Sequence, residues 1–235
     1  MKPLSLHLPL ADRVYRSILD AICDGEFQPG QRLTQDELAR RLEVSRQPVL
    51  QALLLLKQQG FVRETGRRGV VVAALEPDFI SHLYELRGAL DGAACRAAAE
   101  RGQAEAKLWG PKLIAEGRAA VQSGKLGAMI AADTRFHLFL HRISGNPVIA
   151  ETAELHWQHV RRVMGGYLGR ASAREAIWDE HAAIVEAVAQ GDAAEAERLA
   201  RAHVEAALAN LLRSMTQTAA AQGEPKETLE RRNAR

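Results

Sequence analysis

Four side chains in the second half of the sequence could together hold a divalent metal ion. Asp133 and His137 stand four positions apart, which on a helix places both on one face, and His181 and His203 follow later in the chain. One carboxylate and three imidazoles suit zinc, nickel, manganese or iron, and a helical bundle is a normal place to build such a site. Taken alone, the Asp-x-x-x-His spacing is a weak motif, because most single histidines are surface or core residues.

An earlier stretch, residues 34–69, has the residues of a DNA-binding motif. Thr34 followed by Glu37 is a capping-box pattern that begins a short helix, and Glu43 lies in a very short connection after it. Ser45 then fits the N-cap of a second helix. Two helices this close must cross, as in a helix-turn-helix, whose second helix enters the DNA major groove by its N-terminal residues.

The N-terminal residues of that second helix have side chains that suit DNA. Arg46 can form a bidentate pair with guanine or hold a phosphate, and Gln47 can pair with adenine. Ser45 can bind a phosphate through its hydroxyl group or backbone N–H. We therefore predict that Ser45, Arg46 and Gln47 contact double-stranded DNA.

A basic hairpin follows this helix. Residues 61–65 and 70–73 have the composition of two strands, and the residues between them include Arg67, Arg68 and Gly69. Such a hairpin is a wing, whose arginines can reach phosphates or the narrow minor groove. We assign Arg67, Arg68 and Gly69 to the same DNA interface.

The rest of the chain predicts helices. One amphipathic helix precedes the motif at 11–24, and the alanine-rich region beyond Pro77 predicts an all-α bundle with breaks at glycines. The expected helices of the bundle cover residues 77–101, 103–123, 126–144, 147–168, 173–190 and 192–220. The fold class is thus mainly α, with a winged helix-turn-helix at 1–75, a helical domain at 76–220 and a disordered tail at 221–235.

Composition agrees with a globular protein of two domains. The chain has 235 residues, of which 47% are hydrophobic and 26% charged. Residues 1–75 hold 11 Lys and Arg against 8 Asp and Glu, so the small positive excess falls on the expected DNA-binding domain. No apolar run is long enough for a secretory signal or a membrane span, and Cys23 and Cys95 have no metal-binding spacing. We expect reduced thiols and a cytoplasmic protein with no membrane partner.

The motif resembles the winged-helix domain of GntR-type transcriptional regulators. The resemblance rests on AICDGEFQPGQRL, VSRQPVLQALLLLKQQGFV and GRRGVVV, which together belong to about the first third of the chain. In one respect the sequence departs from the family, which usually has Arg-Glu where this chain has Leu50 and Gln51. Either the operator differs from the usual one, or Arg46 and the wing carry more of the affinity.

Residues 78–212 resemble the FCD ligand-binding domain of the FadR-type branch of that family. The similar segments are LYELRGALDGAACRAAA, DTRFHLFLHRISGNPVI and EHAAIVEAVAQGDAAEAERLARAHV. The resemblance implies that Asp133, His137, His181 and His203 bind a divalent transition metal, with zinc the first choice. His141 would be a residue behind the ligands or a substitute ligand.

The same resemblance implies an effector. Arg87 matches the arginine of this domain that faces the cavity, and it would bind a small organic acid together with the metal. The competing role for Arg87 is a helix-surface salt bridge with Asp91 at i+4.

These features predict a ligand-responsive transcriptional regulator and not an enzyme. We expect the regulator to be a repressor. A homodimer would place two winged helices on a palindromic operator, and a metal and a small carboxylate would change the fit. A metalloenzyme is one alternative, because Asp and three His could activate water. A direct metal sensor, in which the ion itself is the signal, is the other.

Overall fold

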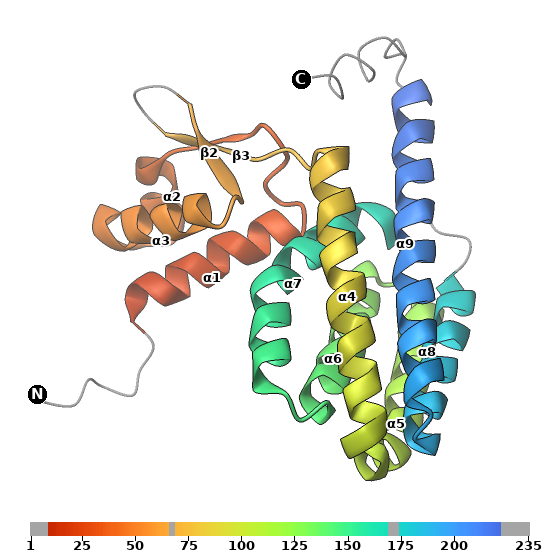
Figure 1. The fold of residues 1–235 in the computed structure, drawn as a ribbon. Helices are drawn as coiled ribbons and strands as arrows, with labels where there is room; N and C mark the ends of the chain where they lie inside the picture. The colour runs from red at the N-terminus through yellow and green to blue at the C-terminus, as the bar shows by residue number, and fades with distance from the viewer. Residues whose placement is uncertain (1–8, 66–68, 169–173, 222–235) are drawn as a thin grey trace, which may run out of the picture. The chain divides into compact units, whose positions relative to one another are not determined.

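The computed structural model describes residues 9–65, 69–168 and 174–221 (Figure 1). The chain divides into two compact units, Met1–Leu75 and Glu76–Arg235. Within the described ranges, no helix is long and apolar enough to cross a membrane. The fold class predicted from the sequence is confirmed, since a small antiparallel sheet accompanies helices that make up most of both units.

The first unit is a winged helix. Its helices are α1 (Leu10–Cys23), α2 (Gln35–Arg41) and α3 (Arg46–Gln58), and its strands are β1 (Arg32–Leu33), β2 (Val62–Glu64) and β3 (Val70–Val72). The sheet has the order β1-β3-β2 with antiparallel pairing, in which Val71 lies opposite both Arg32 and Arg63. The wing predicted from the sequence is therefore confirmed as the β2–β3 hairpin, although Arg67 and Arg68, which the chain carries between the two strands, lie outside the described residues.

The turn between α2 and α3 sets the crossing of the two helices. The Thr34 hydroxyl oxygen accepts a hydrogen bond from the Glu37 backbone N–H, as the capping-box pattern predicts. At the other end of α2, Glu43 has a φ of 53°, and the Val44 N–H donates to the Ala39 carbonyl oxygen at 3.0 Å. This is a Schellman-type helix end, which reverses the chain at once and leaves Ser45 at the N-cap of α3.

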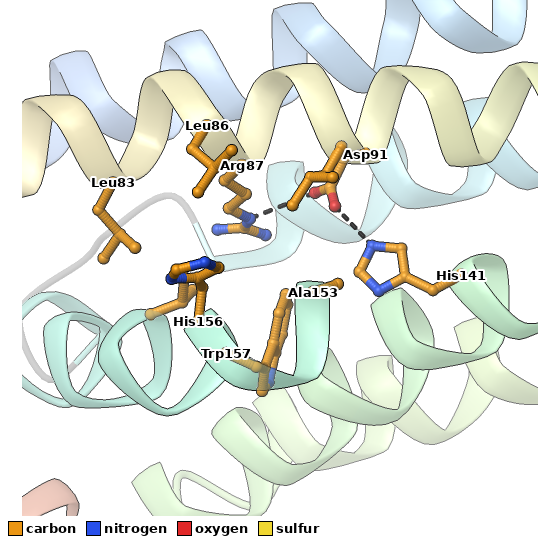
Figure 2. A pocket seen from close by; sticks show the side chains of 10 residues that line it. Leu83, Leu86, Arg87, Asp91, His141, Ala153, His156 and Trp157 are labelled. Atoms are coloured by element: carbon orange, nitrogen blue, oxygen red, sulfur yellow. Dashed lines mark hydrogen bonds and ion pairs between the residues drawn. The ribbon is translucent and has the colours of Figure 1, made fainter. Parts of the chain in front are cut away.

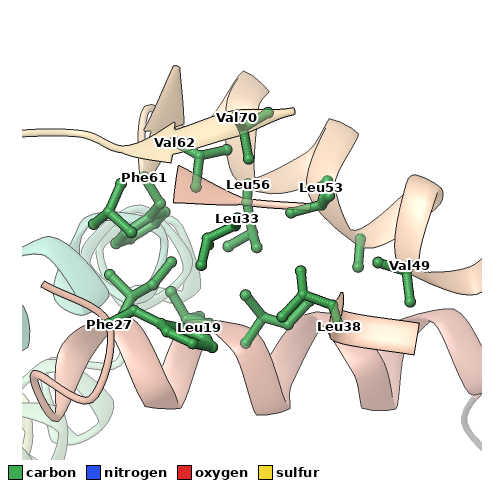
Figure 3. Close-up of a cluster of buried hydrophobic side chains, with 14 of the residues drawn as sticks. Leu19, Phe27, Leu33, Leu38, Val49, Leu53, Leu56, Phe61, Val62 and Val70 are labelled. Atoms are coloured by element: carbon green, nitrogen blue, oxygen red, sulfur yellow. The ribbon is translucent and has the colours of Figure 1, made fainter. Parts of the chain in front are cut away.

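An apolar core holds this unit together and fixes the orientation of α3. Figure 3 shows side chains from α1, α2, α3 and the strands meeting in one cluster. Leu33, Val49, Leu56 and Val72 in this cluster are completely buried. Since α3 buries one face here, the opposite face of the helix is left exposed.

The second unit is a bundle of helices, and its predicted helices are confirmed within a residue or two at each end. They are α4 (Pro77–Arg101), α5 (Gln103–Gln122), α6 (Leu126–Ile143), α7 (Pro147–Leu168), α8 (Arg174–Gln190) and α9 (Ala193–Ala221). Helices α4 and α9 lie side by side over a long distance (Figure 1), and α5 packs on both α6 and α8. Helices α6 and α7 also pack on α4, so side chains from α4, α6, α7, α8 and α9 can meet in the interior.

One element was not expected, and one prediction lies almost wholly outside the described residues. Strand β1 was not predicted, because two residues are too few to show an alternating pattern and pairing with β3 defines the strand. The predicted tail at 221–235 lies outside the described residues except for Ala221, the last residue of α9.

Candidate metal centre and nucleic-acid interface

The four predicted ligands come together inside the helical unit. Asp133 and His137 project from α6, His181 from α8 and His203 from α9, and all four are buried. The Nε2 atoms of His181 and His203 are 3.3 Å apart. An Asp133 carboxylate oxygen lies 3.6 Å from His181 Nε2, and the other oxygen lies 3.8 Å from His137 Nε2.

These distances fit a shared metal ion. The edge of a tetrahedron with metal–ligand bonds of about 2.0 to 2.1 Å is about 3.3 Å long, close to the separations between these donor atoms. Asp133 Oδ2 is buried and has no hydrogen-bond partner among the described residues, which is costly unless a cation is its partner. The three histidines also form a group whose donor atoms lie within 4.8 Å of one another.

Carboxylates behind the ligands orient two of the imidazole rings. His203 Nδ1 donates to Glu180 Oε2 at 2.7 Å, which leaves the Nε2 lone pair facing the cluster. His137 Nδ1 lies 3.3 Å from Asp91 Oδ2, which favours the same tautomer. Neither Glu180 nor Asp91 was predicted as part of the site, although Glu180 directly precedes His181 in the sequence.

Two of the imidazoles, those of His137 and His181, are held in the neutral form that metal binding requires. Burial lowers the pKa of His137, and the nearby Arg87 guanidinium lowers it further. Burial together with His203 and His137 places the pKa of His181 well below its ordinary value. Neutral nitrogens therefore face the cluster at neutral pH, and a cation would not need to displace protons from these two residues.

Arg87 and Asp91 form an ion pair inside the unit, as Figure 2 shows. The Arg87 Nε–Asp91 Oδ2 distance is 3.2 Å, and only 6% and 3% of the two residues are exposed. The pair was expected on the helix surface, and that location is wrong, because α6 and α7 cover this face of α4. Asp91 Oδ1 also accepts a hydrogen bond from His141 Nε2 at 2.6 Å.

One carboxylate therefore organises three groups from α4 and α6. Burial by itself would raise the pKa of Asp91, but His137, His141 and Arg87 together hold it well below the ordinary value, so Asp91 is ionised. His141 is placed behind His137, in contact with Asp91.

The second donor of Arg87 reaches towards the cluster. Arg87 Nη2 lies 2.9 Å from His137 Nε2, the nitrogen that faces the predicted metal position. A cavity runs past the same guanidinium, lined by Tyr84, Asp133, Glu180 and His203 with side chains from α7, α8 and α9. Arg87 and two of the predicted ligands, Asp133 and His203, therefore border the same space for a small ligand.

The predicted DNA-contacting residues lie at the start of α3. Ser45, Arg46 and Gln47 are all exposed. Arg46 forms an ion pair with Asp36 of α2, with the two side chains 73% and 59% exposed. Gly69, at the end of the wing, has a φ of 105°, and an added Cβ would lie 3.0 Å from the Leu33 carbonyl oxygen, so this position requires glycine.

Comparisons with known proteins agree with both units. Residues 10–72 match the family described as bacterial regulatory proteins, gntR family, and residues 82–206 match the FCD domain. An HTH-type transcriptional regulator from the TAR-I ttuE-ttuC' intergenic region of Agrobacterium vitis is 35% identical over 127 residues, covering 52% of this chain and 74% of its own length. The HTH-type transcriptional repressor RspR of Escherichia coli is 25% identical over 197 residues, covering 84% of this chain and 86% of its own.

A solved structure shares the fold. The E. coli protein McbR/YncC superimposes with a TM-score of 0.76 at 19% identity, covering 89% of this chain and all of its own. A winged helix with an exposed recognition helix, followed by an FCD bundle, is the architecture of a DNA-binding transcriptional regulator and not of an enzyme. The chain belongs to the GntR family of bacterial regulatory proteins, with a C-terminal FCD domain.

Proposed function

We propose that this regulator binds a divalent transition metal and a small carboxylate in its helical unit, and that binding of the carboxylate controls DNA binding by the winged helix. The observation that carries the proposal is the convergence of one carboxylate and three imidazoles at 3.3 to 3.8 Å. Asp133, His137, His181 and His203 are the proposed ligands. Zinc is the first choice because it favours nitrogen and oxygen donors in a tetrahedral arrangement, with nickel, manganese or iron as alternatives.

The charges of the buried groups support an anionic effector. Counted with formal charges, Arg87 (+1), Asp91 (−1) and Asp133 (−1) give the buried site a net charge of −1 before a cation is added. A divalent ion would supply positive charge and open coordination positions that a carboxylate can fill. With one monocarboxylate the buried charge is then zero. A small hydroxy acid or sugar acid fits this balance better than a dicarboxylate.

Arg87 is the proposed effector-binding residue. Its Nη2 lies 2.9 Å from His137 Nε2, and this donor would be available to an effector if His137 served as a metal ligand. Arg87 Nε stays on Asp91, so the guanidinium keeps its orientation and can present Nη2 to a carboxylate in the cavity.

On the DNA side, we propose that the protein acts as a homodimer on a palindromic operator, as a repressor. Each winged helix would present Ser45, Arg46 and Gln47 to the major groove and the wing residues Arg67, Arg68 and Gly69 to the backbone or minor groove. The Arg46–Asp36 pair does not oppose this role, because an exposed pair contributes little and can exchange for a phosphate or a guanine. The name of the repressor RspR supports this direction of regulation.

The test measures DNA binding, metal content and acid binding on the same protein. Fluorescence anisotropy would follow binding of the full-length protein to DNA upstream of its own gene across a salt series, with a panel of small carboxylic acids, with and without chelator. We expect one acid to alter binding only when metal is present. If metal alone alters binding, the protein is a direct metal sensor. If acid acts equally after chelation, the metal has no part in the response.

Two variants locate the response. His181→Ala combined with His203→Ala should remove metal, measured by elemental analysis, and the effector response, while specific DNA binding remains. His156→Ala is the matched control, because this histidine belongs to the same unit but lies outside the group of three. Full metal content in the double variant would refute the proposed ligand set.

A separate variant locates the DNA contact. Arg46→Ala should weaken operator binding and reduce the slope of log affinity against log salt by about 1 for each protomer bound. Arg118→Ala is the control, because Arg118 is also an exposed arginine in an ion pair but lies on α5 of the helical unit. Equal salt slopes for Arg46→Ala and the unmodified protein would mean that another element contacts the DNA backbone.

A further inference from the structure

The exposed face of α3 carries leucines as well as polar residues. The core side of the helix is already provided by Val49, Ala52, Leu53 and Leu56, all of which are buried. Leu54 is nevertheless 54% exposed, and Leu50, one turn before it on the same side of the helix, is partly exposed. Neither leucine belongs to the buried core cluster of this unit.

The positions of the exposed side chains are those of a base-reading helix. Gln47, Leu50, Gln51 and Leu54 follow the spacing i, i+3, i+4, i+7, which a recognition helix of the homeodomain type uses to reach base edges in the major groove. All four are exposed or partly exposed, and they begin within the first two residues of α3. The face is continuous with the proposed DNA contact at Arg46.

A groove in the winged helix surrounds the two leucines with charged groups. Arg46, Leu50, Leu54 and Lys57 line it along α3, with Gly69 at its wing side. Lys57 and Arg46 each pair with an acidic residue, Glu64 and Asp36 respectively, but these exposed pairs are weak enough to exchange for phosphates. Cations flanking an apolar strip match the major groove of DNA, where phosphates flank the base edges.

Only one base presents an apolar group in that groove. Thymine has a 5-methyl group at its major-groove edge, whereas guanine, adenine and cytosine present hydrogen-bond donors and acceptors. Leucine can neither donate nor accept a hydrogen bond, so it discriminates by excluding polar edges and burying a methyl group. We propose that Leu50 and Leu54 read thymine methyl groups in each half-site, so that the operator carries thymine at one or two fixed positions. This inference rests on the proposed DNA interface of α3.

The test removes the methyl group without changing the base pairing. High-affinity duplexes would be selected from a random pool with the full-length protein, and each thymine would then be replaced singly by deoxyuridine, which lacks only the 5-methyl. At a contacted position, we expect the affinity to fall about fourfold, from the free energy of burying one carbon group. In a duplex with two half-sites, replacing both equivalent thymines should cost roughly fifteenfold.

Protein variants show which side chain senses the methyl. In Leu50→Ala or Leu54→Ala, the deoxyuridine penalty at the matching position should drop below about twofold, because the two changes remove the same contact. Leu55→Ala is the matched control, since Leu55 is a neighbouring leucine of α3 that is 40% exposed and does not line the groove. The control should keep the full penalty. Thermal unfolding of each variant would show that the winged helix is intact. For Leu54→Ala we expect no decrease in the unfolding temperature, because Leu54 is exposed.

The possible outcomes separate the inference from the DNA-binding proposal. Specific binding that is insensitive to deoxyuridine at every thymine, or a penalty that persists in both leucine variants, overturns the methyl readout alone. Absence of any selected sequence overturns both. If Leu54→Ala instead changes the sedimentation behaviour of the free protein, the strip is a contact between copies of the chain and the inference is also wrong.

Discussion

Replacing Asp91 by asparagine should destabilise the helical unit strongly, because it leaves the Arg87 charge buried without its main partner. The two groups are 3.2 Å apart, and only 6% and 3% of Arg87 and Asp91 are exposed. At an effective dielectric constant of about 20, two charges at this distance interact by about 5 kcal/mol, and breaking a buried pair from one side costs about 3 to 5 kcal/mol. Asp133 also interacts with Arg87, so we expect the lower end, about 3 kcal/mol.

Tryptophan fluorescence can measure this loss in one unit alone. The chain has three tryptophans, Trp109, Trp157 and Trp178, and all three belong to the helical unit. Urea unfolding of the chelator-treated protein, followed by this signal, therefore reports the free energy of unfolding of the helical unit without a contribution from the winged helix. Near the site the signal is sensitive, since the Trp178 ring centroid lies 4.7 Å from that of His181.

Asp179→Asn is the matched control. Asp179 belongs to the same unit and pairs with Arg118 at 2.7 Å, but the side chains of Arg118 and Asp179 are 46% and 67% exposed, so its loss should cost less than about 1 kcal/mol. A combined Arg87→Met and Asp91→Leu variant should recover more than half of the loss, because no unpaired charge remains. If Asp91→Asn costs no more than Asp179→Asn, the pair is not a buried, mutually dependent unit and the reasoning fails. In the proposed metal site, Asp91→Asn should also weaken metal binding about 10- to 100-fold through His137.

Two further predictions concern packing and pH. Gly117→Ala should destabilise the helical unit by roughly 1 to 3 kcal/mol, because the added Cβ would lie 2.1 Å from the Trp178 ring. The added Cβ of Gly127→Ala would meet nothing within 4 Å, so this control should be neutral or stabilising by up to about 1 kcal/mol. Equal effects in urea unfolding would contradict this. The pKa values of His137 and His181 are lowered in the folded state, so the unfolded chain takes up protons first as the pH falls. The free energy of unfolding of the chelator-treated helical unit should therefore decrease below about pH 6.5, by up to about 1.4 kcal/mol per pH unit for each histidine. Above about pH 7 the two histidines should make no contribution to this pH dependence. A flat stability between pH 7.5 and 5.5 would show that these imidazoles are not held neutral.

Helix ends were predictable because glycine marks them for local reasons. Gly124, Gly145 and Gly191 have φ values of 67°, 67° and 78°, which other residues rarely adopt, and each follows the end of a predicted helix. Gly102 also separates two helices, but its φ is −109°. There a Cβ would lie 2.5 Å from the Ile143 carbonyl oxygen, so the glycine is required by packing against the end of α6. The sequence located this break without revealing its cause.

The site was predictable only in part from spacing. The i, i+4 rule places Asp133 and His137 on one face of α6, and their side chains do lie together. No spacing rule connects them with His181 and His203, since helix packing brings α8 and α9 to α6. Residue type alone made these two histidines candidates, and the family resemblance assigned them as ligands. The role of Asp91 was missed for the same reason, because an i, i+4 pair with Arg87 looks the same in sequence whether or not other helices cover it.

Electrostatics in the proposed site link metal and acid binding to one another. A carboxylate that binds beside Arg87 without a metal would make the net formal charge of Arg87, Asp91 and Asp133 more negative, from −1 to −2. With a divalent ion bound, the same carboxylate brings the net formal charge from +1 to zero. Since two like charges about 4 Å apart repel by about 4 kcal/mol at an effective dielectric constant of 20, acid binding without metal is strongly disfavoured. Binding linkage is reciprocal, so the acid must tighten the metal by the same factor by which the metal tightens the acid. A regulator built on this site therefore responds to the acid only in cells that supply the metal, and His137, which contacts both Asp91 and Arg87, is the residue through which the two requirements meet.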